Sequence, residues 1–304
     1  MNNEFPFFSI VIPTYNHGHF IKQCLESVLN QTYTHWEIIV VNNYSEDNTV
    51  EVVESLSDKR IRLINFSNAG IIAASRNKGI ELANGDWICF LDSDDLFYPN
   101  KLEELLRSVM NFDVIYHDLD IYSDSKLMWK KKVKGRELKG NIEKDLIING
   151  NALPCSSVAV RKDILNAVSG FSEDKSLFAV EDSDCWIRIA RITSRFKYIN
   201  KALGKYWVGN NTSVSVKQIN REQNLFNAHC YMLSEVEQEK AQKNMFYRQA
   251  RIFHKLKKYK KAMGKYQDSI SGLTPLRSIV MYCVSMWRRK INCVMRRFLP
   301  SSSV

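Results

Sequence analysis

The chain has 304 residues, of which 45% are hydrophobic and 25% charged, as in ordinary soluble globular proteins. This length accommodates one large domain with an appendage, or two domains. The seven cysteines are scattered, odd in number and never spaced Cys-x-x-Cys, which argues against a disulfide framework and a zinc site and fits a reducing cytoplasm. The first residues lack a basic segment followed by an apolar one, so we expect no signal peptide, and the apolar stretch at 279–287 is too short to span a bilayer.

The net charge of +10 is concentrated at one end of the chain. Residues 251–304 hold thirteen Lys and Arg against the single Asp268, so this segment carries +12 and the remaining residues together carry −2. The body of the protein is therefore close to neutral, and the basic element is the tail.

Apolar runs alternate with segments of helical periodicity in the first third of the chain. Strands are predicted at 7–13, 36–41, 60–66 and 87–90, and helices at 19–31, 45–56 (opened by Ser45) and 71–84. This alternation predicts right-handed crossovers and a mostly parallel sheet flanked by helices, which is an α/β fold. The polar turns 14–18, 42–45 and 92–95 then lie along one rim of the sheet, where nucleotides bind in such folds. Neither a G-x-G-x-x-G nor a P-loop motif is present, so these two phosphate-binding motifs are unsupported.

The rest of the chain is less regular. A further strand is predicted at 113–117 and a helix from Glu181, and beyond about residue 215 the sequence indicates helices. We therefore expect an α/β domain at 1–215 and a basic helical region at 216–304.

Three carboxylates crowd the end of the fourth predicted strand, in the sequence LDSDD at 91–95. Neighbouring carboxylates repel by roughly 4 kcal/mol per pair at 4 Å and an effective dielectric constant near 20. A divalent cation bound by oxygen ligands would offset this repulsion. The same residues also fit a solvated turn in which Asp caps the next helix.

Five stretches, in this order along the chain, resemble glycosyltransferase family 2, whose members have the GT-A nucleotide-sugar fold with a Rossmann-like nucleotide-binding half. They are SIVIPTYN (9–16), VNNYSEDNT (41–49), SRNKG with the following GDWI (75–79 and 85–88), LDSDD (91–95), which matches the family's D-x-D motif, and EDSDCW (181–186), which resembles its E-D motif. Each stretch alone is weak, but together they cover about residues 5–210.

The resemblance implies a UDP-sugar site. Tyr15 and its neighbours would pack on the uracil and ribose, and Arg76 would lie near the base or the diphosphate. Asp92 would contact the ribose or the ion, and Asp94 would hold a Mg²⁺ or Mn²⁺ that bridges the diphosphate. The implied nucleotide-sugar-binding residues are Pro13, Thr14, Tyr15, Asn16, Asn42, Asn43, Arg76, Asp92 and Ser93, and the implied metal ligands are Asp94 and Asp92.

By the same resemblance Asp182 is the general base, with Glu181 beside it. Displacing UDP from an anomeric carbon builds charge on the phosphates, while the acceptor hydroxyl must lose its proton to a carboxylate on the opposite face, which inverts the anomeric centre. The pair lies about 90 residues beyond the acidic turn, so it can form a second wall without joining the ion cluster. Alternatively, these acids only stabilise a helix N-terminus.

The sequence departs from the family pattern at one turn. Where the family usually carries an Asp that accepts from the uracil N3–H, this chain has Asn42 and Asn43. An amide oxygen can still accept that hydrogen bond, so we expect uridine binding to persist.

The tail carries a basic, amphipathic segment at 276–299 with six Arg or Lys and no acid. We interpret it as a helix that lies on an anionic membrane surface, to which six basic residues contribute at most roughly 6 kcal/mol. It could instead pack on the catalytic domain. Nucleic acid is the weakest alternative, because no recognition motif accompanies the charge.

The sequence thus predicts a metal-dependent inverting transferase, with a GT-A-like catalytic domain at 1–215. It would move a hexose or N-acetylhexosamine from UDP to a saccharide acceptor, expected to be lipid-linked, in bacterial surface polysaccharide assembly. We expect it in the cytoplasm, peripheral on the inner face of the membrane. Two rivals remain: a glycoside hydrolase that pairs Asp92 or Asp94 with Asp182, and a non-catalytic nucleotide-sugar-binding scaffold.

Overall fold

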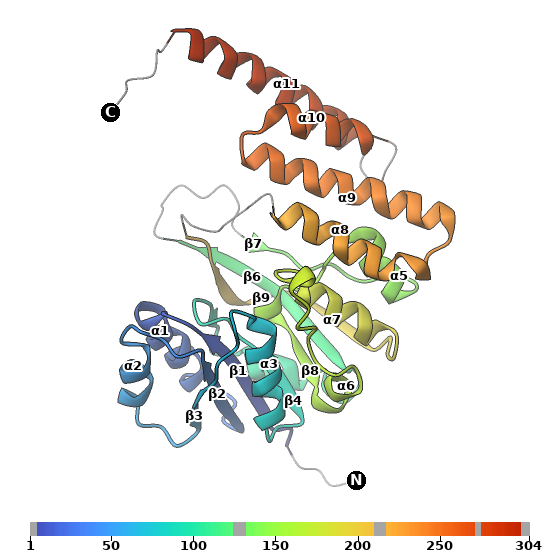
Figure 1. The fold of residues 1–304 in the computed structure, drawn as a ribbon. Helices are drawn as coiled ribbons and strands as arrows, with labels where there is room; N and C mark the ends of the chain where they lie inside the picture. Colours follow the sequence, from blue (N-terminus) through green and yellow to red (C-terminus); the bar gives the residue numbers. More distant parts are fainter. Residues whose placement is uncertain (1–4, 124–131, 210–216, 271–274, 299–304) are drawn as a thin grey trace. The chain divides into compact units, whose positions relative to one another are not determined.

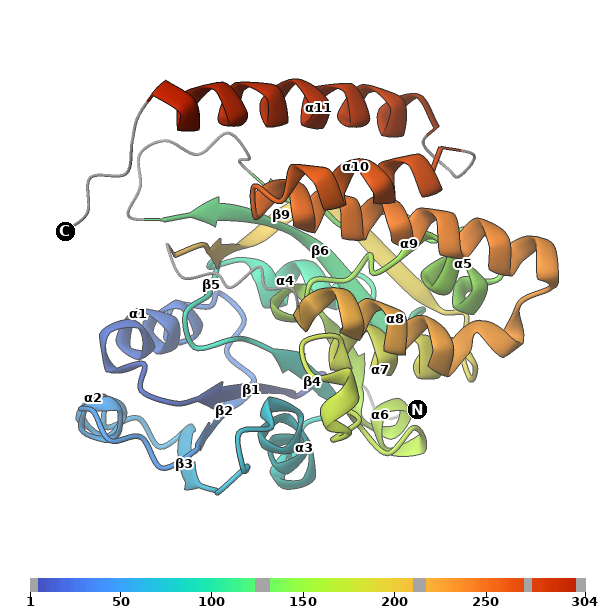
Figure 2. The same ribbon diagram turned by 45° about the horizontal axis from the view of Figure 1, so that its top comes forward.

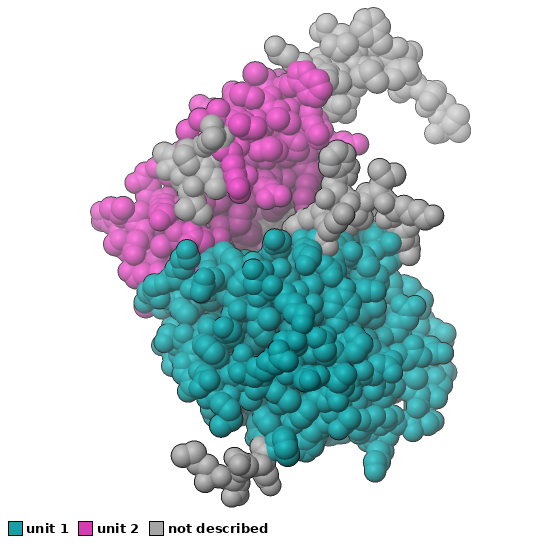
Figure 3. Space-filling view, turned by 180° about the vertical axis from the view of Figure 1, so that it is seen from behind, with its two compact units in different colours: residues 1–143, 151–212 teal, residues 144–150, 213–304 magenta. Residues whose placement is uncertain are grey.

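The computed structural model describes residues 5–123, 132–209, 217–270 and 275–298 (Figure 1). The chain divides into two compact units, coloured separately in Figure 3: residues 1–143 with 151–212, and residues 144–150 with 213–304. The predicted boundary at residue 215 falls among residues outside the described part of the chain, and it remains a prediction.

The first unit is built on one mixed sheet with helices on both faces. Its strands are β1 (Phe8–Thr14), β2 (Trp36–Asn42), β3 (Ile61–Asn65), β4 (Trp87–Phe90), β5 (Leu96–Phe97), β6 (Val114–Tyr122), β7 (Lys132–Val133), β8 (Ala159–Arg161) and β9 (Phe196–Trp207). Its helices are α1 (Gly18–Leu29), α2 (Thr49–Ser55), α3 (Ile72–Leu82), α4 (Lys101–Leu106), α6 (Lys162–Ala167) and α7 (Glu181–Ala190), with short 3-10 turns at Cys155–Ser157 and Lys175–Leu177.

The strand order is β3-β2-β1-β4-β8-β6-β9-β5, with β7 paired to β6. The first four strands pair in parallel, β6 and β9 do so as well, and β8 runs antiparallel between β4 and β6. Most of the described strands therefore point the same way, which confirms the predicted mostly parallel α/β sheet. Every predicted strand among residues 7–90 is present within one or two residues of its expected ends.

Alternation along β1 decides which helices cover which face. Ile10 and Ile12 pack in one buried cluster with residues of α1, α2 and α4, while Val11 points to the other face, where α3 lies (Figure 2). A Cβ at Gly79 of α3 would come within 2.3 Å of Val11 Cγ1, so glycine allows this close approach. On the face of Val11, Trp186 of α7 packs against Phe90 of β4. Helix α3, which carries Arg76, and helix α7, which carries Asp182, thus lie on the same face of the sheet.

The prediction that Ser45 opens the second helix is wrong. Helix α2 begins at Thr49 after Asn48. The Ser45 hydroxyl instead donates to Asn42 Oδ1 (2.6 Å) and accepts from the backbone N–H of Asn16 (2.9 Å). Ser45 therefore ties the second polar turn of the rim to the first, and the helix begins four residues later.

The second unit is helical, as expected for the C-terminal region. It contains α8 (Lys217–His229), a 3-10 turn at Cys230–Met232, α9 (Glu235–Lys255), α10 (Tyr259–Asp268), α11 (Pro275–Phe298) and most of α5 (Ile142–Asn149). A capping box of Ser234 and Glu237 starts α9. Phe253 and Tyr266 belong to the buried core of this second unit. None of the described helices is long and apolar enough to span a bilayer. No sequence feature indicated that residues 144–150 belong to this unit.

Candidate active site

The acidic turn follows β4, as predicted, and alternates between exposed and buried side chains. Asp92 and Asp94 are half-buried, whereas Ser93 and Asp95 are buried. The backbone N–H of Asp92 donates to Ser156 Oγ (3.1 Å), and Asp95 Oδ1 accepts from the backbone N–H of Trp207 (2.8 Å). The 3-10 turn at Cys155–Ser157 and strand β9 thus fix the acidic turn, in which two carboxylates are half-buried and one is buried.

Burial and mutual repulsion disfavour the ionised forms of Asp94 and Asp95 in this turn. Burial and the neighbouring Asp92 raise the pKa of Asp94 to about 6. Burial, followed by the charges of Asp92 and Asp94, raises the pKa of Asp95 well above its usual range. The Asp95 Oδ2 atom is also buried without a hydrogen-bond partner. A cation in front of this turn would therefore be stabilised.

The second acidic pair opens helix α7. Glu181 is buried, and Asp182 is half-buried with Oδ1 accepting from the backbone N–H of Ser183 (2.6 Å). Burial and the adjacent Glu181 raise the pKa of Asp182 to about 6, against an opposing effect of Arg76. The carboxylate of Asp182 is therefore suited to accept a proton near neutral pH.

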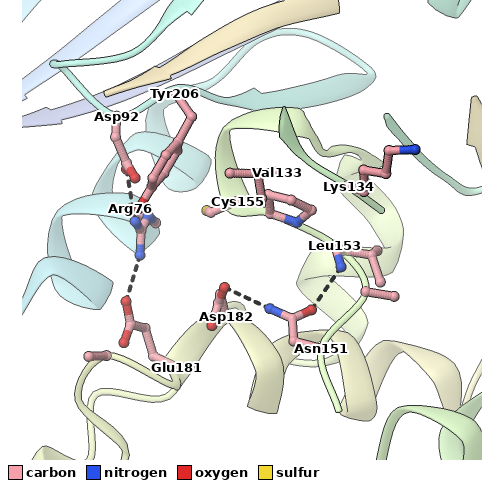
Figure 4. A pocket seen from close by; sticks show the side chains of 13 residues that line it. Arg76, Asp92, Val133, Lys134, Asn151, Leu153, Cys155, Glu181, Asp182 and Tyr206 are labelled. Atoms are coloured by element: carbon pink, nitrogen blue, oxygen red, sulfur yellow. Dashed lines mark hydrogen bonds and ion pairs between the residues drawn. The ribbon is translucent and has the colours of Figure 1, made fainter. Parts of the chain in front are cut away.

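Arg76 of α3 joins the two acidic elements (Figure 4). Its Nη2 lies 2.9 Å from Asp92 Oδ1 and its Nη1 lies 2.8 Å from Glu181 Oε1. The Arg76 side chain is only 4% exposed. One buried guanidinium therefore binds a carboxylate from each acidic motif, while Glu181 and the acidic turn remain on separate elements. Asp182 takes no part in this bridge and lines the cavity described next.

Two cavities adjoin at Asp92. The first, which we call the Asp182 cavity, measures about 530 Å³. It is lined by Arg76, Asp92, Val133, Lys134, Asn151, Ala152, Leu153, Pro154, Cys155, Ala179, Glu181, Asp182 and Tyr206. The second, the Asp94 cavity, measures about 390 Å³. It is lined by Pro13, Thr14, Tyr15, His17, Asn43, Asn68, Gly70, Ile72, Asp92, Ser93, Asp94 and Phe178.

Most of the residues implied for the nucleotide gather at the Asp94 cavity, but three do not. Asn42 is buried, its Nδ2 donates to Asn65 Oδ1 (2.7 Å), and its Oδ1 accepts from Ser45. The Oδ1 of Asn16 accepts from the backbone N–H of Glu46 (2.8 Å). Neither Asn lines either cavity, and Arg76 lines the Asp182 cavity. Of the two Asn that replace the family's Asp, Asn43 alone lines the Asp94 cavity.

Several cavity residues were missed from the sequence. His17 Nδ1 lies 2.7 Å from Ser93 Oγ, and the backbone N–H of Asn68 donates to Asn43 Oδ1 (3.0 Å). His17 sits in the predicted turn 14–18, so its place on the rim was a usable signal. Asn151 and Tyr206 had no such signal, because they reach the Asp182 cavity through contacts distant in sequence.

Comparison with known proteins identifies the family. The sequence profile described as glycosyl transferase family 2 matches residues 9–169, more than half of the chain. The chain belongs to glycosyltransferase family 2. Among curated family members, it is 32% identical over 163 residues to the Escherichia coli UDP-Glc:alpha-D-GlcNAc-diphosphoundecaprenol beta-1,3-glucosyltransferase WfgD, covering 53% of this chain and 62% of WfgD. The matched part is thus less than two thirds of that relative's length.

Solved structures show the same fold. The structure of S. aureus TarS residues 1–349 in complex with UDP superposes with a TM-score of 0.59 at 19% identity, covering 93% of this chain and 87% of that 1–349 chain. The mannosyltransferase PcManGT of Pyrobaculum calidifontis, in complex with GDP-Man and Mn²⁺, gives 0.61 at 16% identity over 93% and 81%. This family 2 chain therefore has the GT-A fold, as the resemblance implied.

Replacing Arg76 with Met tests the bridge. We expect R76M to lower the free energy of unfolding by about 3 kcal/mol or more, because it leaves Glu181 buried without its cation. Arg107→Met, which removes a pair with Glu104 in which the Arg107 side chain is 70% exposed, should lower it by less than about 1 kcal/mol. Urea unfolding followed by tryptophan fluorescence measures both, and equally small effects would contradict the bridging role.

Proposed function

We propose that this family 2 protein is an inverting glycosyltransferase that moves a hexose or N-acetylhexosamine from a UDP-sugar to a hydroxyl of a lipid-linked saccharide. The observation that carries the proposal is the two-sided site: the half-buried Asp182 faces a cavity that Asp92 also lines, and Arg76 bridges Asp92 to the neighbouring Glu181. The proposed setting is surface polysaccharide assembly in bacteria.

The donor nucleotide is assigned to the Asp94 cavity. Tyr15 is 49% exposed at its rim and offers an aromatic face to the uracil, and Asn43 offers an amide oxygen to the uracil N3–H. TarS, which shares the fold, was solved with UDP and also with UDP-GlcNAc. These observations support a uridine nucleotide as the donor.

The donor set of the acidic turn fits a divalent cation. Asp92 and Asp94 line the same cavity, and the raised pKa of Asp94 reflects burial beside another carboxylate. Within the described residues, no three His, Cys, Asp or Glu side chains are grouped so as to hold a metal alone. Mg²⁺ commonly takes one or two carboxylates and completes its shell with substrate phosphates and water. When bound, the Mg²⁺ or Mn²⁺ would stabilise the negative charge on the departing diphosphate.

The chain's own residues perform the proton transfer. The carboxylate of Asp182 takes the proton of the acceptor hydroxyl as that oxygen forms its bond to the anomeric carbon and the bond from that carbon to UDP breaks. Attack from the side opposite the leaving group inverts the configuration. Arg76 holds Asp92 and Glu181, so that Asp182 is left as the acid available to the acceptor. The name of WfgD specifies a diphosphoundecaprenol-linked acceptor, which supports a lipid-linked acceptor here.

Substitution of Asp182 tests this role. We expect Asp182→Asn to reduce transfer from the UDP-sugar at least about a hundredfold while UDP with Mn²⁺ still raises the melting temperature. Because the base must be ionised and the pKa of Asp182 is raised to about 6, wild-type activity should fall as the pH drops below about 6. Asp163→Asn, at an exposed carboxylate paired with Arg161, is the matched control and should retain activity. A D182N variant that transfers sugar normally would favour a non-catalytic role for this acid.

We further propose that helix α11 docks the protein on an anionic membrane surface. Within the second unit, Ser278 and Ser285 are buried, and their hydroxyls bond Ser269 Oγ (2.9 Å) and His254 Nδ1 (2.7 Å). At helical spacing, the other side of α11 carries a stripe of exposed or largely exposed residues, Ile279, Val280, Cys283, Met286 and Trp287. Arg277, Arg288 and Arg289 are also exposed, and each would contribute about 1 kcal/mol near anionic lipid.

Vesicle co-sedimentation tests the docking. The protein should sediment with phosphatidylglycerol-containing vesicles, less with pure phosphatidylcholine, and Trp287→Glu should reduce the bound fraction at least about fivefold, because it removes an aromatic anchor and adds repulsion. Val236→Glu, at a 78% exposed apolar residue of α9, is the matched control and should bind as the wild type does. Equal binding of W287E and wild type would exclude this stripe as the membrane contact.

A further inference from the structure

Asn151 contacts the proposed base directly, although nothing in the family motifs points to it. Its Nδ2 donates to Asp182 Oδ2 (3.0 Å), and its Oδ1 accepts from the backbone N–H of Leu153 (2.9 Å). Figure 4 shows the amide lying between the carboxylate and the backbone of the 151–153 segment.

The two contacts fix the orientation of the amide. If the amide were turned over, its oxygen would face a carboxylate oxygen and its NH₂ group would face a backbone N–H. Both contacts would then be repulsive. The NH₂ group of Asn151 therefore points at Asp182, whose carboxylate oxygen accepts its hydrogen bond.

The segment that carries Asn151 is anchored to the base's own helix. The indole Nε1 of Trp186 donates to the backbone oxygen of Leu153 (3.2 Å). Trp186 is buried against Phe90 and Phe171, and it lies one helical turn beyond Asp182 on α7. Two adjacent hydrogen bonds thus join the 151–153 segment to α7, and they hold the exposed Asn151 beside Asp182.

Both oxygens of the Asp182 carboxylate are consequently held. Oδ1 accepts from the backbone N–H of Ser183 and Oδ2 accepts from Asn151. Both Asn151 and Asp182 line the Asp182 cavity. A carboxylate that accepts hydrogen bonds is favoured in its charged form.

We propose that Asn151 is a positioning residue that orients the Asp182 carboxylate toward the acceptor hydroxyl and favours its ionised form. The proposal rests on the function proposed above, in which Asp182 takes the acceptor proton. It assigns to residue 151 a task that neither the acidic motifs nor the bridge by Arg76 performs.

Other groups also act on Asp182, and their balance sets the direction of the effect. The charged and titratable groups around it are Glu181 and Cys185 on α7, Arg76 on α3, Asp92 after β4, Lys134 after β7, Cys155 in the 3-10 turn and Tyr206 on β9. Burial and Glu181 raise the pKa of Asp182, while Arg76 and the bonds from Ser183 lower it. Loss of the Asn151 donor removes a contact that stabilises the anion, so the pKa of Asp182 must rise.

Two substitutions separate the donor from the rest of the side chain. Asn151→Asp keeps the shape and the oxygen that accepts from Leu153, but it replaces the donor with a second carboxylate. Asn151→Ala removes both contacts. With the protein, a UDP-sugar and saturating Mn²⁺, we expect kcat/KM at pH 7 to fall about tenfold in N151A and about a hundredfold or more in N151D. The acid limb of the pH profile should move to higher pH in both.

Controls distinguish positioning from a general loss of structure. Asn200→Ala, at an exposed Asn on β9, should leave the pH profile unchanged. The exchanged variant N151D/D182N restores a donor–acceptor pair, so it should recover the melting temperature without recovering transfer. A fall in activity with an unmoved acid limb and a lowered melting temperature would overturn the proposal, as would unchanged activity in N151D.

A second measurement keeps this inference apart from the function it rests on. Carboxyl ¹³C NMR of the Asp-labelled protein, with the Asp182 signal assigned by its loss in D182N, reports the titration without any turnover. We expect the Asp182 midpoint to rise by about one pH unit or more in N151A, which corresponds to a tenfold change in the ionisation equilibrium. If the wild type transfers no sugar, the proposed function fails, whereas an unmoved midpoint overturns the role of Asn151 regardless of activity.

Discussion

A buried guanidinium between two carboxylates organises the site. Arg76 is 3% exposed and bonds Asp92 and Glu181, which arrive from opposite parts of the chain. Placing a cation in the protein interior is unfavourable unless its hydrogen-bonding groups are matched by anions. Because the buried charge of Arg76 must be neutralised, the end of β4 and the start of α7 are held together. The two acidic motifs therefore line the same cavity.

In the proposed mechanism, neighbouring acids have different tasks. Glu181 and Asp182 are adjacent in sequence, yet Glu181 is paired with Arg76 while Asp182 faces the cavity beside a neutral amide. Burial raises the pKa of Asp182 to about 6, which is close to the value that favours a base working at neutral pH. In the acidic turn, Asp94 has a similarly raised pKa but faces the other cavity, where a cation and a diphosphate can supply the missing positive charge and ligands. In the proposed mechanism, two carboxylates of similar pKa would therefore serve two different substrates.

Local sequence patterns predicted the strands and helices, whereas tertiary packing determined which side chains reach the cavities. The alternation of apolar and helical segments predicted β1 to β4, and the rule that ligands bind beyond the carboxyl ends of strands predicted the rim. Asn42 and Asn43 were equivalent in sequence. The register that sets Asn42 beside Asn65 on β3 turns its side chain inward and leaves Asn43 at the Asp94 cavity. Ser45 fits a helix cap by composition, but its hydroxyl is engaged between two loops. Asn151 could not be found, because its partner lies 31 residues away on an element whose placement depends on the buried Trp186.

A crystal structure of the protein with UDP and Mn²⁺ tests the central claim most directly. The account predicts uridine in the Asp94 cavity between Tyr15 and Asn43, Mn²⁺ between Asp94 and the diphosphate, and Arg76 still bonded to Asp92 and Glu181. Nucleotide in the Asp182 cavity, or a bound state in which Arg76 has left Glu181 to pair with the phosphates, would contradict it.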